Sequence, residues 1–202
     1  MLVGIGLGPG DSSLLTLQAV DYLRRSDVVY VPGEMAAKLV EGYCEPVMLE
    51  FPMTHDSDEL ESCWEQHAHT IAAHARDELV SFGAIGDPNF FSTFSHVKGV
   101  LSRCYPLIEV ITVPGISSIT AFASRANVEV GSSFGVSDGS KETVKIVLKA
   151  TEPERVAEQL RVEGYTEFLL CERLFSERER ITDELPERSD YFSILYARKV
   201  SL

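Results

Sequence analysis

The sequence predicts an α/β fold made of two α/β domains, and two observations support this class. Over the first half of the chain, short apolar runs alternate with segments of helical periodicity, a pattern typical of a mainly parallel sheet. Beyond Pro114-Gly115 there are fewer helices per strand, which predicts a mixed sheet. We therefore expect an N-terminal domain over residues 1–114 and a C-terminal domain over residues 115–202.

The first strand and the loop after it occupy residues 2–11. Leu2-Val3-Gly4-Ile5 is an apolar run that leads into the glycine-dense segment Gly6–Asp11, as a buried strand leads into a loop. Asp11, Ser12 and Ser13 are good N-cap residues, and leucines and a valine follow at helical spacing. A helix is therefore predicted to open directly after Asp11.

The other elements of the first half follow in alternation. The long segment 57–79 has apolar residues at steps of three and four, which predicts an amphipathic helix. A second helix is predicted over 93–104. Strands are predicted at 27–31, 47–51, 80–85 and 108–113.

The second half is predicted to be richer in strands. After a small-residue helix over 116–126, one further helix over 151–162 carries Pro153 near its start, where proline is favoured. The charged run Glu177–Arg180 indicates a solvated hairpin or loop. Strands are predicted at 134–137, 144–148, 167–171 and 191–200.

Composition excludes several classes of protein. The net charge of −13 over 202 residues argues against a nucleic-acid partner, which would require a basic surface. No apolar run approaches the roughly 18 residues that a membrane span needs, and no signal peptide is expected at the N-terminus. The four cysteines form no C-x-x-C pair, so we expect free thiols in a reducing cytoplasm.

Three loops carry the residue types of a binding site. They are Gly8–Asp11, Gly86–Thr93 and Pro114–Ser118, and each follows a predicted strand. In a parallel sheet they would lie along one edge, where ligands bind. Tight strand–helix turns are the structural alternative. Dinucleotide binding, with Glu34 as the ribose-binding acid, is disfavoured because Glu34 lies too far along and Pro9 lacks an N–H for phosphate.

Cys63, His67 and His74 share one flank of the long predicted helix. Cys63 and His67 are four residues apart and could share a metal, but two ligands do not make a closed site, and His74 is about 10 Å further along the axis. Solvated histidines on a helix flank are the simpler interpretation, and we expect no protein-bound metal.

The three loop motifs resemble those of the tetrapyrrole methylase family. The opening Gly4-Ile5-Gly6-Leu7-Gly8-Pro9-Gly10-Asp11, then Gly86-Asp87-Pro88, then Val113-Pro114-Gly115-Ile116-Ser117-Ser118 occur in the family's order. Within the family, the tail Ser92-Thr93-Phe94-Ser95 is most similar to enzymes that methylate C20 of precorrin-2 or cobalt-factor II.

This resemblance implies a cytoplasmic, usually homodimeric methyltransferase of cobalamin and porphyrin biosynthesis. S-adenosylmethionine would lie in a cleft between the two domains. It would contact Ile85, Gly86, Asp87, Phe90, Ser117, Ser118, Leu174 and Ala197. The tetrapyrrole would face Gly8, Pro9, Gly10, Asp11, Ser92 and Thr93, with Asp11 as the candidate catalytic residue. Helix capping is the alternative role of Asp11, and turn stabilisation that of Asp87.

Other functions remain open at this point. The same fold could methylate another tetrapyrrole position or another target. From other classes, the chain could be a nucleotide-cofactor oxidoreductase or a non-catalytic tetrapyrrole carrier.

Overall fold

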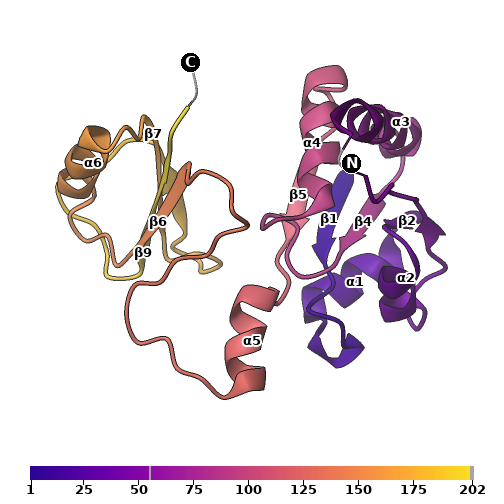
Figure 1. Cartoon of the computed structure of the whole chain (residues 1–202), viewed down its shortest axis with the longest axis horizontal. Helices are drawn as coiled ribbons and strands as arrows, with labels where there is room; N and C mark the ends of the chain where they lie inside the picture. The colour runs from indigo at the N-terminus through magenta and orange to yellow at the C-terminus, as the bar shows by residue number, and fades with distance from the viewer. Residues whose placement is uncertain (55, 201–202) are drawn as a thin grey trace. The chain divides into compact units, whose positions relative to one another are not determined.

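The computed structural model describes residues 1–54 and 56–200, and it confirms the α/β class (Figure 1). The chain forms two compact units, Met1–Phe134 and Gly135–Leu202. The first unit contains a parallel sheet and the second an antiparallel sheet. Backbone contacts keep the helix α5 (Ser118–Ala126) with the first unit, whereas the sequence predicts a boundary after residue 114.

The first sheet has the strand order β3-β2-β4-β1-β5, and all of its pairs are parallel. The strands β1 and β4 lie in its interior and are buried along their whole length. Because the strands are parallel, their carboxyl ends meet at one edge. The strands are β1 (Leu2–Gly6), β2 (Val28–Val31), β3 (Val47–Met48), β4 (Val80–Ala84) and β5 (Val110–Val113).

Helices cover both faces of this sheet, as hydrophobic residues on both sides of buried parallel strands require. On one face, α1 (Leu17–Arg25) and α2 (Glu34–Val40) share a core with Val3 and Ile5. On the other face, α3 (Ser57–Ala75) and α4 (Thr93–Cys104) pack around Phe82. Two pairs of helices therefore enclose the sheet and leave its carboxyl edge to loops (Figure 1).

The second unit has a sheet of order β6-β9-β7-β8 in which every pair is antiparallel, so the predicted mixed sheet is antiparallel. The helix α6 (Pro153–Val162) shares a small core with Leu195 and Ala197 of the interior strand β9. The strands are β6 (Val144–Leu148), β7 (Glu167–Glu172), β8 (Arg180–Thr182) and β9 (Ser193–Arg198).

Several elements differ from their predicted bounds for local reasons. Asp11 caps only a short 3₁₀ helix, η1 (Ser12–Leu14), and α1 begins later because the Thr16 hydroxyl accepts the Ala19 N–H at 3.1 Å. The third strand is two residues long and ends at Met48, and α3 ends at Ala75. Residues 134–137 form no strand, and α2 had no counterpart in the prediction.

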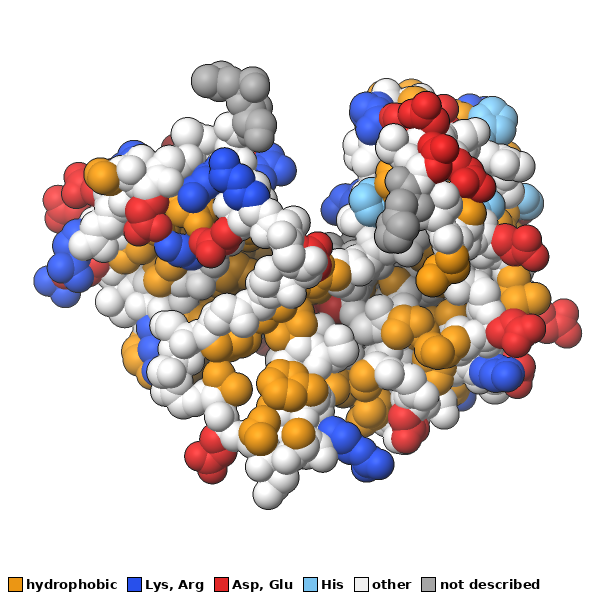
Figure 2. Space-filling view, viewed as in Figure 1, with side chains coloured by type: hydrophobic (Ala, Val, Ile, Leu, Met, Phe, Trp, Pro, Cys, Tyr) orange, Lys and Arg blue, Asp and Glu red, His pale blue; other side chains and the backbone are white. Residues whose placement is uncertain are grey.

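The surface carries scattered charges and a local apolar area. Hydrophobic side chains gather on the visible face of α5, where Phe122 is 52% exposed (Figure 2). Within the described residues, no helix combines the length and the apolar composition that crossing a membrane requires.

Candidate functional site

The loops that follow β1 and β4 are joined to each other at the carboxyl edge of the first sheet. The Gly8 N–H donates to the Gly86 carbonyl oxygen at 3.2 Å, and the Gly86 N–H donates to the Gly8 carbonyl oxygen at 2.8 Å. Both glycines have positive φ angles, 74° and 76°, which would cost other residues about 1–3 kcal/mol. Two of the predicted loops therefore form one bonded unit.

The third predicted loop packs against this unit so closely that only glycine fits. A Cβ atom added to Gly115 would lie 2.2 Å from the Gly86 carbonyl oxygen and 2.6 Å from Cα of Gly6. A Cβ atom on Gly6 would in turn lie 2.3 Å from the Gly115 nitrogen. The glycines thus allow backbone to approach backbone, and they bring all three loops together as the sequence predicts.

Asp87 ties two of these loops together through its carboxylate. The side chain is 7% exposed. One oxygen, Oδ1, accepts the Asn89 N–H at 2.9 Å, and the other, Oδ2, accepts the Gly115 N–H at 3.1 Å. The first bond stabilises the turn after β4, and the second ties that turn to the loop after β5. Turn stabilisation, the alternative role considered for Asp87, is therefore present, and a contact with a donor molecule stays a prediction.

The turn from Pro9 to Asp11 lies at the exposed end of the first loop. Gly10 has a φ of 131°, a conformation that glycine tolerates. The Asp11 Oδ1 accepts the Ser13 N–H at 2.8 Å. Hydrogen bonding to the Ser13 side chain, and secondly to this N–H, lowers the pKa of the Asp11 carboxyl below its ordinary 3.8. Asp11 therefore caps η1 as a carboxylate at neutral pH, and its catalytic role stays a prediction.

The bonded loops also bear on dinucleotide binding. A phosphate cradle needs free N–H groups at the start of a helix. Here the Gly8 N–H is already bonded to Gly86, and the first helical turn after it is the short η1. Glu34 opens α2 and does not lie at the tip of β2. These contacts disfavour the dinucleotide hypothesis on structural grounds.

A cavity of about 550 Å³ lies beside the carboxyl ends of β2 and β4. Three predicted site residues, Ile85, Ser92 and Thr93, contribute to its lining, together with Phe51 and Phe82. Ser92 also begins α4, because its hydroxyl accepts the Phe94 N–H at 3.2 Å. Among the described residues that line the cavity, Glu50 is the one with a charged side chain. The cavity therefore suits an apolar, flat or bulky group.

Phe90, Ser117 and Ser118 lie next to the joined loops. Phe90 follows Asp87 in the turn and is 46% exposed. Ser117 caps α5, since its hydroxyl accepts the Ile119 N–H at 3.2 Å, and Ser118 is the first residue of that helix. Their side chains thus stand at the same edge of the sheet, with one hydroxyl already used in capping.

Leu174 and Ala197 belong to the second unit and differ in accessibility. Leu174 is 40% exposed and lines a cavity of about 520 Å³ with Leu148, Arg173 and Phe192. Ala197 lies in the central strand β9, paired with β6 and β7, and its methyl group is buried in the small core. Leu174 is therefore free to contact a ligand through its side chain. A contact at Ala197 stays a prediction that its burial does not favour.

The rim of this second cavity holds strained backbone. Lys149, Arg173 and Phe175 have φ angles of 56°, 51° and 61°, and such residues cluster at functional sites. Arg173 Nε donates to Asp190 Oδ2 at 3.0 Å, so its charge is balanced. Lys149 Nζ lies 5.1 Å from the centre of the Tyr191 ring, and its hydrogen bond to Tyr191 raises the pKa of the Lys149 amine. Both cations therefore have partners within the second unit.

Cys63 and His67, on the flank of α3, both contact the carbonyl group of Glu50. Cys63 Sγ lies 3.6 Å, and His67 Nε2 2.7 Å, from the Glu50 carbonyl oxygen. His74 bonds to Glu78 instead. Among the described residues, no group of three or more His, Cys, Asp or Glu side chains is arranged to hold a metal.

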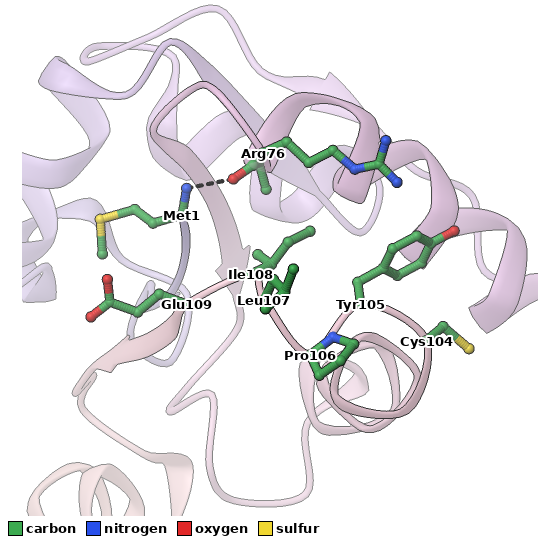
Figure 3. Close-up of a pocket in the computed structure, with 9 residues that line it drawn as sticks. Met1, Arg76, Cys104, Tyr105, Pro106, Leu107, Ile108 and Glu109 are labelled. Carbon is green, nitrogen blue, oxygen red and sulfur yellow. Dashed lines mark hydrogen bonds between the residues drawn. The ribbon is translucent and has the colours of Figure 1, made fainter.

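A cavity of about 560 Å³ lies at the opposite, amino-terminal edge of the first sheet (Figure 3). Tyr105 and Arg76 lie side by side on one flank, with the guanidinium carbon 5.7 Å from the ring centre. Leu107 and Ile108 form an apolar part of its lining. None of the predicted site residues lines this cavity.

Sequence reasoning missed the wall formed by Leu49, Glu50 and Phe51. The sequence predicts a strand over 47–51, yet the chain leaves the sheet after Met48 and these three residues line the 550 Å³ cavity. The available signal was Pro52, which ends regular structure but does not say where the side chains go.

Comparison with known proteins finds a matching family model and curated relatives. The family model described as Tetrapyrrole (Corrin/Porphyrin) Methylases matches residues 1–190. A protein of Methanocaldococcus jannaschii, named a probable cobalt-precorrin-2 C(20)-methyltransferase, is 35% identical over an alignment of 134 residues that covers 62% of this chain and 56% of that relative. The precorrin-2 C(20)-methyltransferase of a Sinorhizobium species is 31% identical over 62% of this chain and 57% of its own length. The chain thus spans little more than half the length of these relatives.

Solved structures share the fold at lower identity. A cobalt precorrin-4 methyltransferase superposes with a TM-score of 0.53 at 18% identity, over 98% of this chain and 94% of its own. A uroporphyrin-III-C-methyltransferase from Thermus thermophilus gives 0.51 at 18% identity, over 98% and 91%. At this identity the likeness concerns the fold alone.

Proposed function

Because this chain belongs to the tetrapyrrole (corrin/porphyrin) methylase family, we propose that it is a methyltransferase that uses S-adenosylmethionine. We further propose that the acceptor is precorrin-2 or its cobalt complex and that the methylated atom is C20. The observation that carries this choice is the match to relatives named C(20)-methyltransferases, at 30–35% identity over 62% of this chain.

The reaction is an in-line displacement. The electron-rich C20 carbon attacks the methyl carbon, the bond from that carbon to sulfur breaks, and its electron pair stays on sulfur as S-adenosylhomocysteine. The acceptor then loses the proton of the methylated carbon. The chemistry needs no activated serine or cysteine, so the protein's contribution is to align the two reactants and exclude water.

The joined loops suit this task because they are rigid. Asp87 and the glycines hold three loops at distances that backbone hydrogen bonds define. In the proposed arrangement, the donor contacts the turn from Ile85 to Phe90 and the start of α5 at Ser117 and Ser118. Alignment then depends on Asp87 as a positioning residue.

The tetrapyrrole is proposed to lie against Gly8–Asp11, Ser92 and Thr93, with part of the macrocycle in the 550 Å³ cavity. Its apolar lining suits a flat carbon ring. Asp11 is ionised at neutral pH, since its pKa is lowered, and we propose that it contacts the substrate and receives the released proton.

The second unit is proposed to supply further donor contacts at Leu174 and Ala197. The support is the cavity beside Leu174 and the strained backbone at its rim. The partnered charges of Arg173 and Lys149 limit repulsion of a sulfonium ion bound there.

We also propose that the protein acts as a homodimer in the cytoplasm, with neither nucleic acid nor membrane as a partner. Cys44, Cys63, Cys104 and Cys171 are free thiols, as a reducing compartment allows. In α5 no residue is buried, which leaves its apolar side chains available to a second copy. Light scattering coupled to gel filtration would give the mass in solution.

Two measurements test the function. Calorimetry should detect binding of S-adenosylmethionine and none of NADH; the reverse result would refute the donor assignment. Incubation with isotope-labelled donor and cobalt-factor II should give a product that carries the label at C20. A label at another ring position would support the methyltransferase assignment and refute the C20 assignment.

A further inference from the structure

The wall of the 550 Å³ cavity includes a segment that leaves the sheet early. The strand β3 ends at Met48, and the Leu49 N–H makes one further bond, to the Val31 carbonyl oxygen at 2.9 Å. Glu50, Phe51 and Met53 line the cavity without regular secondary structure. Something other than the sheet must therefore hold this segment against the cavity.

Two side chains of α3 hold it at a single atom, the Glu50 carbonyl oxygen. His67 Nε2 lies 2.7 Å from this oxygen and Cys63 Sγ lies 3.6 Å from it. The two residues are one helical turn apart and so share a face. Because a carbonyl oxygen only accepts, Nε2 must carry the proton in this hydrogen bond.

The His67 ring makes a second contact with the same segment. The Phe51 ring packs edge-on against it, with 4.8 Å between ring centres. Phe51 also packs edge-on against Phe82 of β4, with 6.3 Å between ring centres. Both Phe51 and Phe82 line the cavity. His67 thus orients both the backbone and an aromatic side chain of the wall.

We propose that His67, assisted by Cys63, is a positioning residue of the acceptor site: it clamps the wall from Leu49 to Phe51 and so sets the shape of the cavity. The inference rests on the proposed function, which assigns the macrocycle to this cavity. In place of a solvated histidine on a helix flank, His67 has a specific role: it acts through Glu50 and Phe51 and touches neither reactant.

The matched control is a histidine two positions along the same helix. His69 bonds through Nδ1 to the Tyr105 hydroxyl, away from the clamped wall. The substitution His69→Ala removes a ring of the same size from α3 and leaves the Glu50 contact intact. His67→Gln is the conservative variant, since its amide N–H can donate to the same carbonyl oxygen.

The first experiment needs no turnover. Hydrogen exchange at the Leu49 amide should accelerate about fivefold in His67→Ala, the change expected on losing one net hydrogen bond. Exchange in His69→Ala should match the wild type. Equal exchange in His67→Ala and the wild type would overturn the clamp, whether or not the protein is a methyltransferase.

The second experiment links the clamp to the acceptor. Fluorescence titration with uroporphyrin III, a polycarboxylate tetrapyrrole, should show about fivefold weaker binding by His67→Ala and near-complete rescue by His67→Gln. With a methyl acceptor, KM should rise by a similar factor while kcat changes less than about twofold. Faster exchange at Leu49 with unchanged ring affinity would overturn the acceptor role and leave the donor chemistry standing.

Discussion

Gly115→Ala is the sharpest test of the joined loops. The added methyl group would lie 2.2 Å from the Gly86 carbonyl oxygen, whereas real Cβ atoms essentially never approach closer than 3.0 Å. The two loops must therefore separate by at least about 0.8 Å, the difference between these distances. No flexible side chain can absorb this shift, because the atoms in contact belong to backbone.

The cost follows from the bonds that such a shift weakens. They are the reciprocal pair between Gly8 and Gly86 and the bond from the Gly115 N–H to Asp87. At a net value of about 1 kcal/mol each, losing two or three of them lowers the free energy of unfolding by about 2–3 kcal/mol. Overpacked cores lose a similar amount, about 1–3 kcal/mol.

Urea unfolding measured by tryptophan fluorescence isolates this effect. Trp64, the chain's single tryptophan, packs against the core of the first unit, so its emission reports on that unit. With a slope of about 2 kcal/mol per molar, the midpoint should fall by about 1–1.5 M.

Gly99→Ala is the control, since no atom other than its chain neighbours and its own helix backbone lies within 4 Å of the Cβ added in α4. It should stabilise the unit by about 0.5–1 kcal/mol. A Gly115→Ala midpoint equal to that of the wild type would refute the close-packed loops.

The remaining predictions concern charge and pH. Asp87→Ala should weaken binding of S-adenosylhomocysteine at least about tenfold in calorimetry, because two loops lose their shared anchor; unchanged affinity in the folded variant would contradict its positioning role. Burial and the hydrogen bond to Glu142 raise the pKa of Tyr165 to about 12. Since the unfolded tyrosine ionises near 10, the second unit should lose stability between about pH 10 and 12. Thermal melts of Tyr165→Phe should show less of this loss, and an identical pH profile would refute the assignment. Glu50→Gln should strengthen uroporphyrin III binding about threefold at low salt, because it removes the one charge of the described cavity lining, which repels the carboxylates of the ligand. Unchanged affinity would show that the ligand's carboxylates do not lie near Glu50.

The parts of the fold that the sequence predicts are those with a local signal. The helix over 93–104 and the strand over 144–148 are found with their predicted bounds, because apolar spacing and capping residues mark both ends. The predicted helix after Asp11 is wrong in its start, since two N-cap residues, Asp11 and Thr16, compete over a few positions. The strand over 47–51 is also wrong in length, because apolar residues that line a cavity have the same pattern as residues in a sheet.

The candidate site divides in the same way. The three loops could be predicted because glycine after a strand marks close approach without naming the partner. The sequence does not predict the partner of each glycine, because the partner depends on the strand order β4-β1-β5. This order brings Gly115 against Gly86 and lets Asp87 bond to Gly115. Periodicity indicates only whether a side chain faces the core, so it places His67 and Cys63 on the flank of the helix and does not predict their contact with Glu50.

In the proposed reaction, the His67 clamp matters because it places one wall of the acceptor cavity. A rigid edge built from glycine and Asp87 aligns reactants only if the opposing wall of the cavity is equally well placed. Beyond Met48 that wall belongs to neither a strand nor a helix, so its position depends on side chains of α3. Substitutions at His67 should therefore act on the acceptor, and substitutions at Gly115 on the donor as well as on folding. Parallel losses of both affinities in both variants would show that the cavity and the joined loops are one cooperative unit.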